Sequence, residues 1–452
     1  KKPLVICGVA MSSVDPPSLF SNLTADCKPV ADKSRSYSEE DQEFIRGEVG
    51  RLLNEDIIEP SISPWRAQVL VAGGNNHKKR LVIDYSRTIN RFTELDAFPL
   101  PNISEMARKV ANYSLFSALD LKSAYHQIPL RENEKCFTAF EACGQLYQFN
   151  RVPFGVTNGV ACFQRVLDNI IKSENLNDTF AYVDNITVCG KDQESHDHNL
   201  KQFMNVAAKY NLSFNHDKSI ISVSEINMLG YNIKHREIRP DQDRLKPLLE
   251  LGEPENLVTL RRTVGMFSYY SQWIPKFSEI IHPLTTCRTF PLPQNARDAF
   301  SKLKLAIASS VINTIEAGIP LVVETDASDF AIAATLNQSG RPVAFYSRSL
   351  SGSEQRWSSV EKEACAIVDA LKKWKHFLLG RHFQVVTDQR SVSYMFDSRK
   401  LGKIKNDKIM RWRVELSPFQ FDIIHRPGKV NHVADTFSRS VNTCAASFLS
   451  ED

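Results

Sequence analysis

The sequence predicts a multidomain protein of mixed α and β structure, in which a larger α+β part precedes a smaller α/β domain. The chain has 452 residues, which is more than one ordinary hydrophobic core accommodates. Both parts contain short apolar runs that end in an acidic residue, as buried strands do at a polar edge. A proline-containing break, FPLPQNARDAF, lies between the two parts at residues 290–300.

Composition narrows the class of protein. Hydrophobic residues make up 42% of the chain and charged residues 24%, which is typical of globular domains. The net charge is only +4, so charge alone does not identify a nucleic-acid-binding protein. Nine cysteines without a C-x-x-C pair indicate reduced, intracellular thiols. No apolar run reaches the about 20 residues of a membrane span, so no membrane partner is expected.

Local patterns predict the elements of the first part in chain order. Residues 1–36 indicate an extended lead-in, and Ser38 gives the start signal of an amphipathic helix. Residues 67–86 predict a β-hairpin with a basic tip. Residues 115–130 predict a strand that leads into a short helix, and residues 180–190 predict a tight hairpin.

The second part has its own alternation of elements. Residues 319–336 and 382–392 predict strands that carry acidic residues, and an apolar stripe over residues 360–378 predicts one amphipathic helix between them. This order suggests a separate α/β domain at residues 316–440, followed by a tail at residues 441–452.

Two acidic residues of the first part end apolar runs. Asp120 ends SLFSALD, and Asp184 ends TFAYVD. Clustered carboxylates repel one another unless a cation neutralises them. Two strands that bring these acids together would therefore form a divalent-metal site.

Four acids of the second part lie at expected strand ends or helix faces. They are Asp326 in VVETDAS, Glu363 in EKEACAIV, Asp388 in VVTDQRS and Asp435 in VNHVADTFSR. A two-metal nuclease needs such a set, because carboxylates must hold two ions about 3.5–4 Å apart across the scissile phosphate. Glu361 is the competing candidate for the glutamate of this set.

Six sequence blocks occur in a fixed order between about residues 35 and 290: NRFTELDAFPLPNI, FSALDLKSAYHQIPL, TAFEACGQLYQFNRVPFGVTNGVACFQRVLDNII, YVDN, MLGYNIKHREIRPD and VGMFSYYSQWIPKFSEIIHPL. Together they resemble a gypsy-type (Metaviridae) LTR-retrotransposon reverse transcriptase, and the acids of the second part resemble the RNase H of the same elements. The resemblance implies a right-hand polymerase followed by an RNase H-like α/β domain. Residues 37–240 would form its fingers and palm, and residues 241–315 its thumb and linker.

The resemblance assigns the polymerase metals to three residues. Asp120 and Asp184 would hold two Mg²⁺ ions, with the backbone carbonyl of Leu121 assisting. Asn185 departs from the family pattern, because the family has a second acid there. An amide offers a neutral oxygen, so Asn185 is expected to leave the fold intact and to weaken the electrostatic hold on the metals.

The resemblance also assigns contacts to the nucleotide and the primer. Arg80, together with Lys78 or Lys79, would contact the triphosphate, and Tyr125 would lie under the sugar and exclude a 2′-hydroxyl. The nucleotide pocket and the grip on the primer end would be formed by Phe154, Gly155, Leu229, Gly230 and Tyr231.

In the second part, the resemblance implies an RNase H site that binds two Mg²⁺ ions through the four acids, with Mn²⁺ as an alternative metal. His425 matches a mobile family histidine that is implicated in proton transfer or product release. The run from Arg399 to Arg413 holds seven basic residues and one acid, and we interpret it as a patch that follows substrate phosphates.

The resemblance therefore implies RNA- and DNA-templated DNA synthesis, together with degradation of RNA in RNA–DNA hybrids. The expected partners are hybrid, DNA primer–template and deoxynucleoside triphosphates, and a homodimer on substrate stays open. The expected location is intracellular, in a cytoplasmic virus-like particle or in the nucleus, and the chain is expected to be one segment of a larger polyprotein. The alternative is a nucleic-acid-binding or host-adopted protein with a silent polymerase site and an active RNase H, which Asn185 favours.

Overall fold

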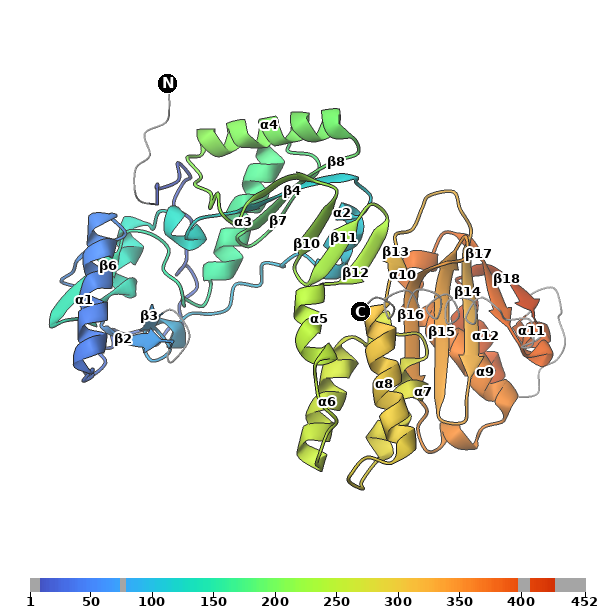
Figure 1. Ribbon diagram of the computed structural model, residues 1–452. Helices are drawn as coiled ribbons and strands as arrows, with labels where there is room; N and C mark the ends of the chain where they lie inside the picture. Colours follow the sequence, from blue (N-terminus) through green and yellow to red (C-terminus); the bar gives the residue numbers. More distant parts are fainter. Residues whose placement is uncertain (1–8, 74–78, 397–406, 427–452) are drawn as a thin grey trace, which may run out of the picture. The chain divides into compact units, whose positions relative to one another are not determined.

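The computed structural model describes residues 9–73, 79–396 and 407–426. The chain divides into two compact units, residues 1–226 and 227–452, and Figure 1 labels the helices and strands of each. The finer boundaries expected near residues 240 and 315 both fall inside the second unit, and they stay predictions. No helix within the described ranges is long and apolar enough to cross a membrane.

One sheet of the first unit has five strands in the order β1-β6-β5-β2-β3. Ser38 caps the helix that precedes this sheet, since its side chain accepts a hydrogen bond from the backbone N–H of Asp41. The expected hairpin is confirmed as the antiparallel pair β2 and β3, while its basic tip lies outside the described residues. The elements are α1 (Glu39–Asn54), β1 (Ile58–Pro60), β2 (Ala67–Ala72), β3 (Arg80–Asp84), β5 (Phe140–Ala142) and β6 (Gln145–Phe149).

The other sheet of the first unit has four strands in the order β7-β8-β4-β9. The predicted tight hairpin is confirmed as β7 and β8, and the predicted strand with a short helix is confirmed as β4 followed by a 3₁₀ turn at Ala124–Gln127. The elements are α2 (Ile103–Val110), β4 (Leu115–Asp120), α3 (Gly159–Ser173), β7 (Thr179–Tyr182), β8 (Asn185–Gly190), α4 (Gln193–Lys209) and β9 (Ile220–Val223).

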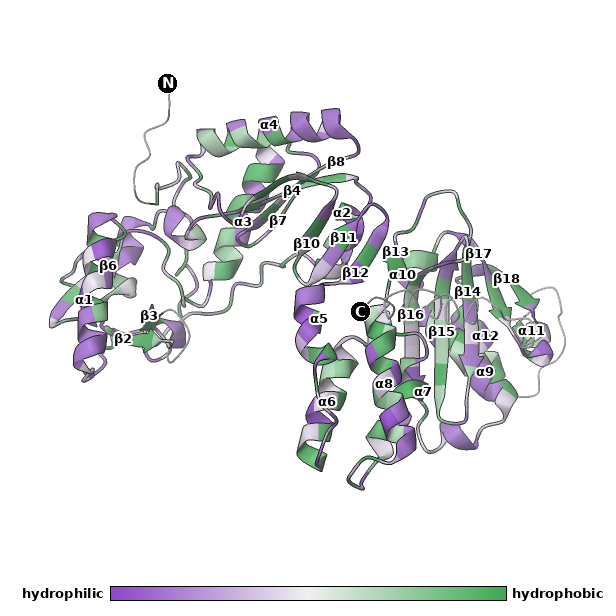
Figure 2. Cartoon of the chain, in the orientation of Figure 1, coloured by the Kyte–Doolittle hydropathy of each residue, from purple (hydrophilic) through white to green (hydrophobic). Residues whose placement is uncertain are grey.

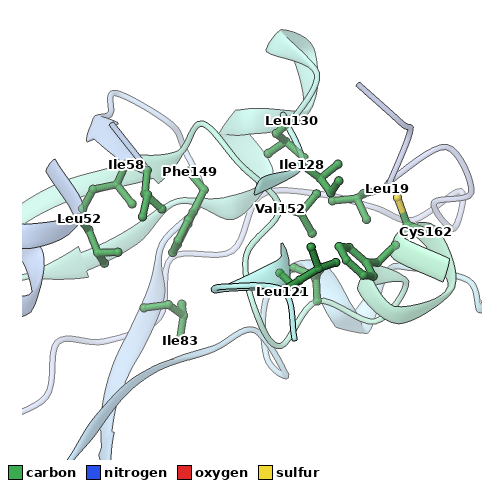
Figure 3. Close-up of a cluster of buried hydrophobic side chains, with 14 of the residues drawn as sticks. Leu19, Leu52, Ile58, Ile83, Leu121, Ile128, Leu130, Phe149, Val152 and Cys162 are labelled. Carbon is green, nitrogen blue, oxygen red and sulfur yellow. The ribbon is translucent and has the colours of Figure 1, made fainter. Parts of the chain in front are cut away.

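One continuous core joins the two sheets of the first unit. Figure 3 shows Leu52 and Ile58 next to Phe149 on one side, and Leu121 beside Val152 on the other. The described part of the lead-in contains no helix, as expected, yet it belongs to this core, because Leu19 and Phe20 are buried. The catalytic candidates of this unit therefore stand on a packed interior.

The second unit begins with a small sheet and a group of helices. Its four strands follow the order β10-β11-β12-β13, and β10 crosses the boundary between the two units. Helices α7 and α8 pack against each other around Phe267, Leu284 and Phe300. The elements are β10 (Glu225–Met228), β11 (Tyr231–Lys234), β12 (Glu237–Pro240), α5 (Gln242–Leu249), α6 (Leu257–Tyr269), α7 (Phe277–Thr286), α8 (Gln294–Ala308) and β13 (Ile312–Asn313).

A five-stranded sheet in the order β16-β15-β14-β17-β18 completes the second unit. Strand β14 pairs antiparallel with β15 and parallel with β17, so the sheet is mixed. Helix α9 packs on β14 and β15. The elements are β14 (Leu321–Ala327), β15 (Ala331–Gln338), β16 (Arg341–Ser349), α9 (Ser359–Lys373), α10 (Lys375–Leu378), β17 (His382–Thr387), α11 (Arg390–Phe396), α12 (Asp407–Leu416) and β18 (Gln420–His425).

The prediction of one helix over residues 360–378 is wrong. Helix α9 ends at Lys373, and Trp374 is its C-cap before the short helix α10 begins. Leu371 before the break, Trp374 at it and Leu378 after it are all buried. The apolar stripe therefore continues across the break, although the helix does not. In Figure 2, α6 carries both hydrophilic and hydrophobic residues, as a helix with one face in the core does.

Replacing Gly190 by alanine should destabilise the first unit. A Cβ at Gly190 would lie 2.4 Å from the backbone nitrogen and the Cα of His196, so α4 would have to move away from β8. Overpacking of this kind costs about 1–3 kcal/mol, and the free energy of unfolding should fall by that amount. Urea unfolding followed by circular dichroism measures the change.

Gly47→Ala is the matched control. No atom lies within 4 Å of a Cβ at Gly47, which is an exposed position in the middle of α1. Alanine is favoured over glycine in a helix by roughly 0.5–1 kcal/mol, so this variant should be slightly more stable than the original chain. Equal shifts in the two variants would contradict the steric account of Gly190.

Candidate active sites

A tight hairpin turn presents Asp184 at the edge of the four-stranded sheet. The turn follows β7 and precedes β8, and Val183 in it adopts a positive φ of 51°. The N–H of Val183 donates to the side-chain carbonyl of Gln164 at 2.8 Å, and the amide of Gln164 donates to the carbonyl of Ala181 at 3.1 Å. Gln164 is fully buried in α3, and its two hydrogen bonds hold the strained turn against that helix.

Asp120 lies beside this turn. It ends β4, where its backbone pairs with Asn185 of the antiparallel strand β8. The N–H of Leu121 also donates to the backbone carbonyl of Asp184 at 3.2 Å. Both carboxylates are partly exposed, and the Asn185 amide donates to Oδ1 of Asp184 at 3.3 Å. The two acids are thus brought together, and an amide stands where a third carboxylate would add charge.

Lys218 is a neighbour of this site that sequence reasoning missed. Its Nζ lies 3.7 Å from Oδ2 of Asp120. The residue follows β4 by almost 100 positions and belongs to the loop before β9, which pairs with β4. No local pattern marks such a lysine, since only the pairing of distant strands brings it to the acid.

Tyr125 also lies near the turn. Burial raises the pKa of Tyr125 to about 12, and the negative charge of Asp184 adds to the rise. Its ring packs against Phe154 at 4.8 Å and Phe163 at 5.1 Å between ring centroids. Phe154 is half exposed, so the two rings form an aromatic surface next to the acids. Contact of Tyr125 with a sugar stays a prediction.

The remaining nucleotide candidates of the first unit differ in their surroundings. Arg80 begins β3 and is exposed, whereas Lys79 forms ion pairs with Glu40 at 2.7 Å and Asp41 at 2.9 Å. Lys78 lies outside the described residues. Gly155 has a positive φ of 90°, and a Cβ there would lie 3.4 Å from the carbonyl oxygen of Ile83. That position therefore favours glycine for a backbone reason.

The three residues expected at the primer end form a different turn. Leu229 and Gly230 join β10 to β11, both with positive φ, and Tyr231 packs on Trp273 at 5.7 Å between ring centroids. A Cβ at Gly230 would lie 2.9 Å from the guanidinium of Arg244. This turn belongs to the second unit, and Asp120 and Asp184 belong to the first. A primer contact therefore stays a prediction.

Three acids of the second unit meet at one edge of its sheet. Strands β14 and β17 are parallel, so Asp326 near the end of β14 and Asp388 just after β17 reach the same edge. Glu363 approaches from α9, and one carboxylate oxygen of each residue lies within 4.8 Å of the others. Such a cluster of hard oxygen ligands suits a divalent cation.

The electrostatics of this cluster also suit a cation. Burial raises the pKa of Glu363 to about 8, with the charges of Asp388 and Asp326 adding to the rise. Burial and Asp326 raise the pKa of Asp388 as well. The N–H of Ala327 donates to Oε1 of Glu363 at 2.7 Å, while its buried Oε2 has no hydrogen-bond partner in the described parts of the chain. A metal ion would provide a partner for Oε2 of Glu363 and would offset the repulsion among the three carboxylates.

The other nuclease candidates are arranged around these three acids. Glu361 forms a capping box with Ser358 and an ion pair with Lys408 at 3.0 Å. His425 ends β18, with its Nε2 3.0 Å from the backbone oxygen of Asp388. Asp435 lies outside the described residues, as does much of the basic run at residues 399–413.

Sequence reasoning missed one cation at this cluster. Lys276 precedes α7, and its ammonium forms an ion pair with Oδ2 of Asp326. No local pattern predicts this pair, because Lys276 belongs to a segment that resembles the thumb and Asp326 to the RNase H-like domain.

Two regions of the chain match known protein families. Residues 73–233 match the family of reverse transcriptases (RNA-dependent DNA polymerases), and residues 317–419 match the RNase H-like domain found in reverse transcriptase. The chain therefore contains a reverse transcriptase domain followed by an RNase H-like domain.

Among curated proteins, the Pol polyprotein from the Drosophila melanogaster transposon 297 is 32% identical over 92% of this chain and 40% of its own length. The Pol polyprotein from transposon gypsy of the same species is 30% identical over 92% of this chain and 42% of its own length. The resemblance to gypsy-type retrotransposon Pol proteins is confirmed. The chain spans less than half the length of these relatives.

Solved structures support the fold. A foamy viral protease-reverse transcriptase in complex with dsDNA has a TM-score of 0.78 and 19% identity, over 93% of this chain and 90% of that chain. The same type of protein in complex with RNA/DNA hybrid has a TM-score of 0.70 and 19% identity, over 93% and 58%. The predicted fold class, a reverse transcriptase fold followed by an RNase H-like α/β domain, is confirmed.

The stability of the metal-free protein should depend on pH through Glu363. Its folded pKa, about 8, lies above the ordinary value of 4.5, so folding favours the protonated carboxyl. The stabilisation is full below pH 4.5 and is lost as the pH rises to about 8. The free energy of unfolding, compared with that of Glu363→Gln, should therefore fall across this range in urea unfolding with a chelator present.

Glu255 is exposed, and Glu255→Gln serves as the control. The difference in the free energy of unfolding between the original chain and this variant should not fall from pH 4.5 to 8. Added Mn²⁺ should restore stability above pH 8 in the original chain, because a metal ion favours the ionised carboxylate. A constant difference between the original chain and Glu363→Gln from pH 4.5 to 8 would contradict the burial of an uncompensated acid.

Proposed function

We propose that this chain is a retrotransposon reverse transcriptase and ribonuclease H, an enzyme with two metal-dependent sites. The observation that carries the proposal is the cluster of Asp326, Glu363 and Asp388, with ligand oxygens within 4.8 Å and one buried oxygen of Glu363 unpaired. Three separate elements converge there, which a chance surface cluster does not require. The two family matches support the same pair of activities.

The nuclease reaction is hydrolysis of the RNA strand in an RNA–DNA hybrid. Two Mg²⁺ ions, when bound, would activate a water molecule and stabilise the leaving oxygen. Asp326, Glu363 and Asp388 would hold these ions, with Asp435 as the fourth ligand that the resemblance implies. His425 would exchange a proton or assist product release from its position beside Asp388.

The polymerase reaction is nucleotidyl transfer from a deoxynucleoside triphosphate to a primer. Asp120 and Asp184, with the Leu121 carbonyl, would hold the ions that neutralise the triphosphate. Arg80 would bind the phosphates, and Tyr125 with Phe154 would shape the sugar pocket. RNA–DNA hybrid and DNA primer–template are the proposed macromolecular substrates, because proteins of the same fold are known in complex with RNA/DNA hybrid and with dsDNA.

A second candidate function is supported by Asn185. Its amide donates to Asp184 and adds no negative charge to the metal turn. The chain would then keep the nuclease and bind nucleic acid with a silent polymerase site. The retention of Asp120, Asp184, Arg80 and Tyr125 favours a polymerase that is weakened over one that is lost.

The Asp388→Asn variant tests the nuclease. It removes charge from the metal cluster and conserves side-chain volume, so the protein should fold normally. Cleavage of the RNA strand in Mg²⁺ or Mn²⁺ should fall by at least about 100-fold, the loss typical of an electrostatic catalytic group. Gel analysis of a labelled hybrid measures this rate.

Asp298→Asn is the matched control, since Asp298 lies on the surface of α8 and accepts a hydrogen bond only from Gln294 among the interactions described. It should cleave like the original chain. Unchanged cleavage in Asp388→Asn, and also in Asp326→Asn, would overturn the nuclease assignment.

The Asn185→Asp variant tests the polymerase. Primer–template affinity depends mainly on phosphate contacts and should hardly change. Extension on an RNA template in Mg²⁺ should rise by about 100-fold or more, by analogy with a restored oxyanion donor. RNase H cleavage should not respond, because that site uses its own ions.

Asn177→Asp adds the same charge at an exposed turn before β7 and should leave extension unchanged. Brisk extension by the original chain, with little gain in Asn185→Asp, would mean that Asp120 and Asp184 suffice. No extension in either protein would favour the silent-site function.

A further inference from the structure

A lysine from outside the RNase H-like domain reaches the nuclease carboxylates. Lys276 is the N-cap residue of α7, and its Nζ forms an ion pair with Oδ2 of Asp326. The match to the RNase H-like domain begins at residue 317, so this cation is supplied by the segment that precedes the domain. The ammonium thus neutralises one of the three carboxylates that could hold a metal ion.

Two contacts hold α7 against the sheet that carries Asp326. The N–H of Ser278 donates to Oγ of Ser347 at 3.0 Å, and that hydroxyl donates to Oγ of Ser278 at 3.1 Å. The ring of His282 stacks on Phe330 with 4.4 Å between ring centroids. Phe330 lies in the turn between β14 and β15, directly after the strand of Asp326. Lys276 is therefore kept within reach of the cluster.

The backbone of Lys276 offers no reason for a lysine at this position. Its φ of 52° and ψ of 31° lie in the left-handed region, which glycine and asparagine adopt at lower cost. The side chain is about half exposed. The ion pair with Asp326 is the interaction that distinguishes lysine here from those residues.

The ammonium acts on the whole cluster and not on Asp326 alone. Lys276 pairs with Asp326, and one carboxylate oxygen of Asp326 lies within 4.8 Å of an oxygen of Glu363 and of Asp388. Three carboxylates within 4.8 Å repel one another, and one ammonium offsets part of that repulsion. Lys276 therefore neutralises part of the negative charge that a metal ion would otherwise neutralise.

We propose that Lys276 is a positioning residue of the nuclease site that competes with a divalent metal ion for Asp326. The inference rests on the proposed nuclease function. An ammonium and a divalent ion bound to the same carboxylate repel each other, so the charge of Lys276 opposes metal binding at Asp326. Without a metal ion, the ion pair holds the Asp326 carboxylate in place. Weakening this ion pair costs free energy when a metal ion binds, so the metal affinity of the free protein is lower.

Metal binding without nucleic acid tests this competition directly. The full chain carries Asp120→Asn and Asp184→Asn, so that the polymerase acids contribute no site, and Mn²⁺ is titrated by isothermal calorimetry. Lys276→Met removes the ammonium and keeps an unbranched side chain that is one heavy atom shorter. The Kd for Mn²⁺ should fall about 10-fold, since an exposed side chain interacts with a metal ion through partly screened charge. Lys276→Gln should give a similar shift.

Two controls separate competition from a general change in charge. Lys276→Arg retains the cation, and its Kd should stay within about threefold of the starting chain. Lys372→Met changes the net charge equally. Lys372 lies on the last turn of α9, and it pairs with Glu415 of α12 at 2.6 Å, not with an acid of the cluster. Its Kd should not change.

The outcomes are distinguishable. An unchanged or weaker affinity in Lys276→Met and Lys276→Gln, with the original binding removed by Asp388→Asn, would overturn the competition and leave the nuclease site standing. Binding that persists in Asp388→Asn would overturn the nuclease site itself, and the inference with it. A gain of affinity that Lys372→Met reproduces would also overturn the inference, because it would reflect net charge alone.

Discussion

Mutual repulsion among carboxylates is the constraint on which the second unit depends. The parallel pairing of β14 and β17 brings Asp326 and Asp388 to one edge, and the packing of α9 drives Glu363 into the same space. Each of these acids would be more stable apart and in water. The apolar contacts between α9 and the strands beneath it, such as those of Ile367 and Leu371, hold them together.

The first unit also brings two acids together, Asp120 and Asp184, but it holds them by a turn and a buried glutamine. One of its acids, Asp120, ends strand β4, and the other, Asp184, lies in the turn before the neighbouring antiparallel strand β8; that turn contains a valine with positive φ. A buried glutamine in α3 holds the turn by two hydrogen bonds to the backbone. The position of Asp184 therefore depends on helix packing as much as on the hairpin, while the exposed Asn185 can vary without disturbing either.

Local sequence patterns predicted the hairpins and the acids at strand ends, because turn residues and apolar runs act over a few positions. The preference for Glu363 over Glu361 agrees with the geometry, since Glu361 is engaged in a helix cap and an ion pair. Lys218 and Lys276 could not be predicted, because tertiary packing alone brings them to Asp120 and Asp326. The break at Trp374 was missed for the same reason, as an apolar stripe does not show where a helix bends.

The extended segment near the start of the chain is tied to a partner far along the sequence. Glu134 is buried, and its carboxylate accepts hydrogen bonds from the N–H groups of Leu19 and Phe20 and from the hydroxyl of Ser18. On the ribosome, Leu19 leaves the tunnel well before Glu134 is made. The segment around Leu19 can therefore make these hydrogen bonds only after the chain has been synthesised beyond Glu134, so the first unit completes its folding late.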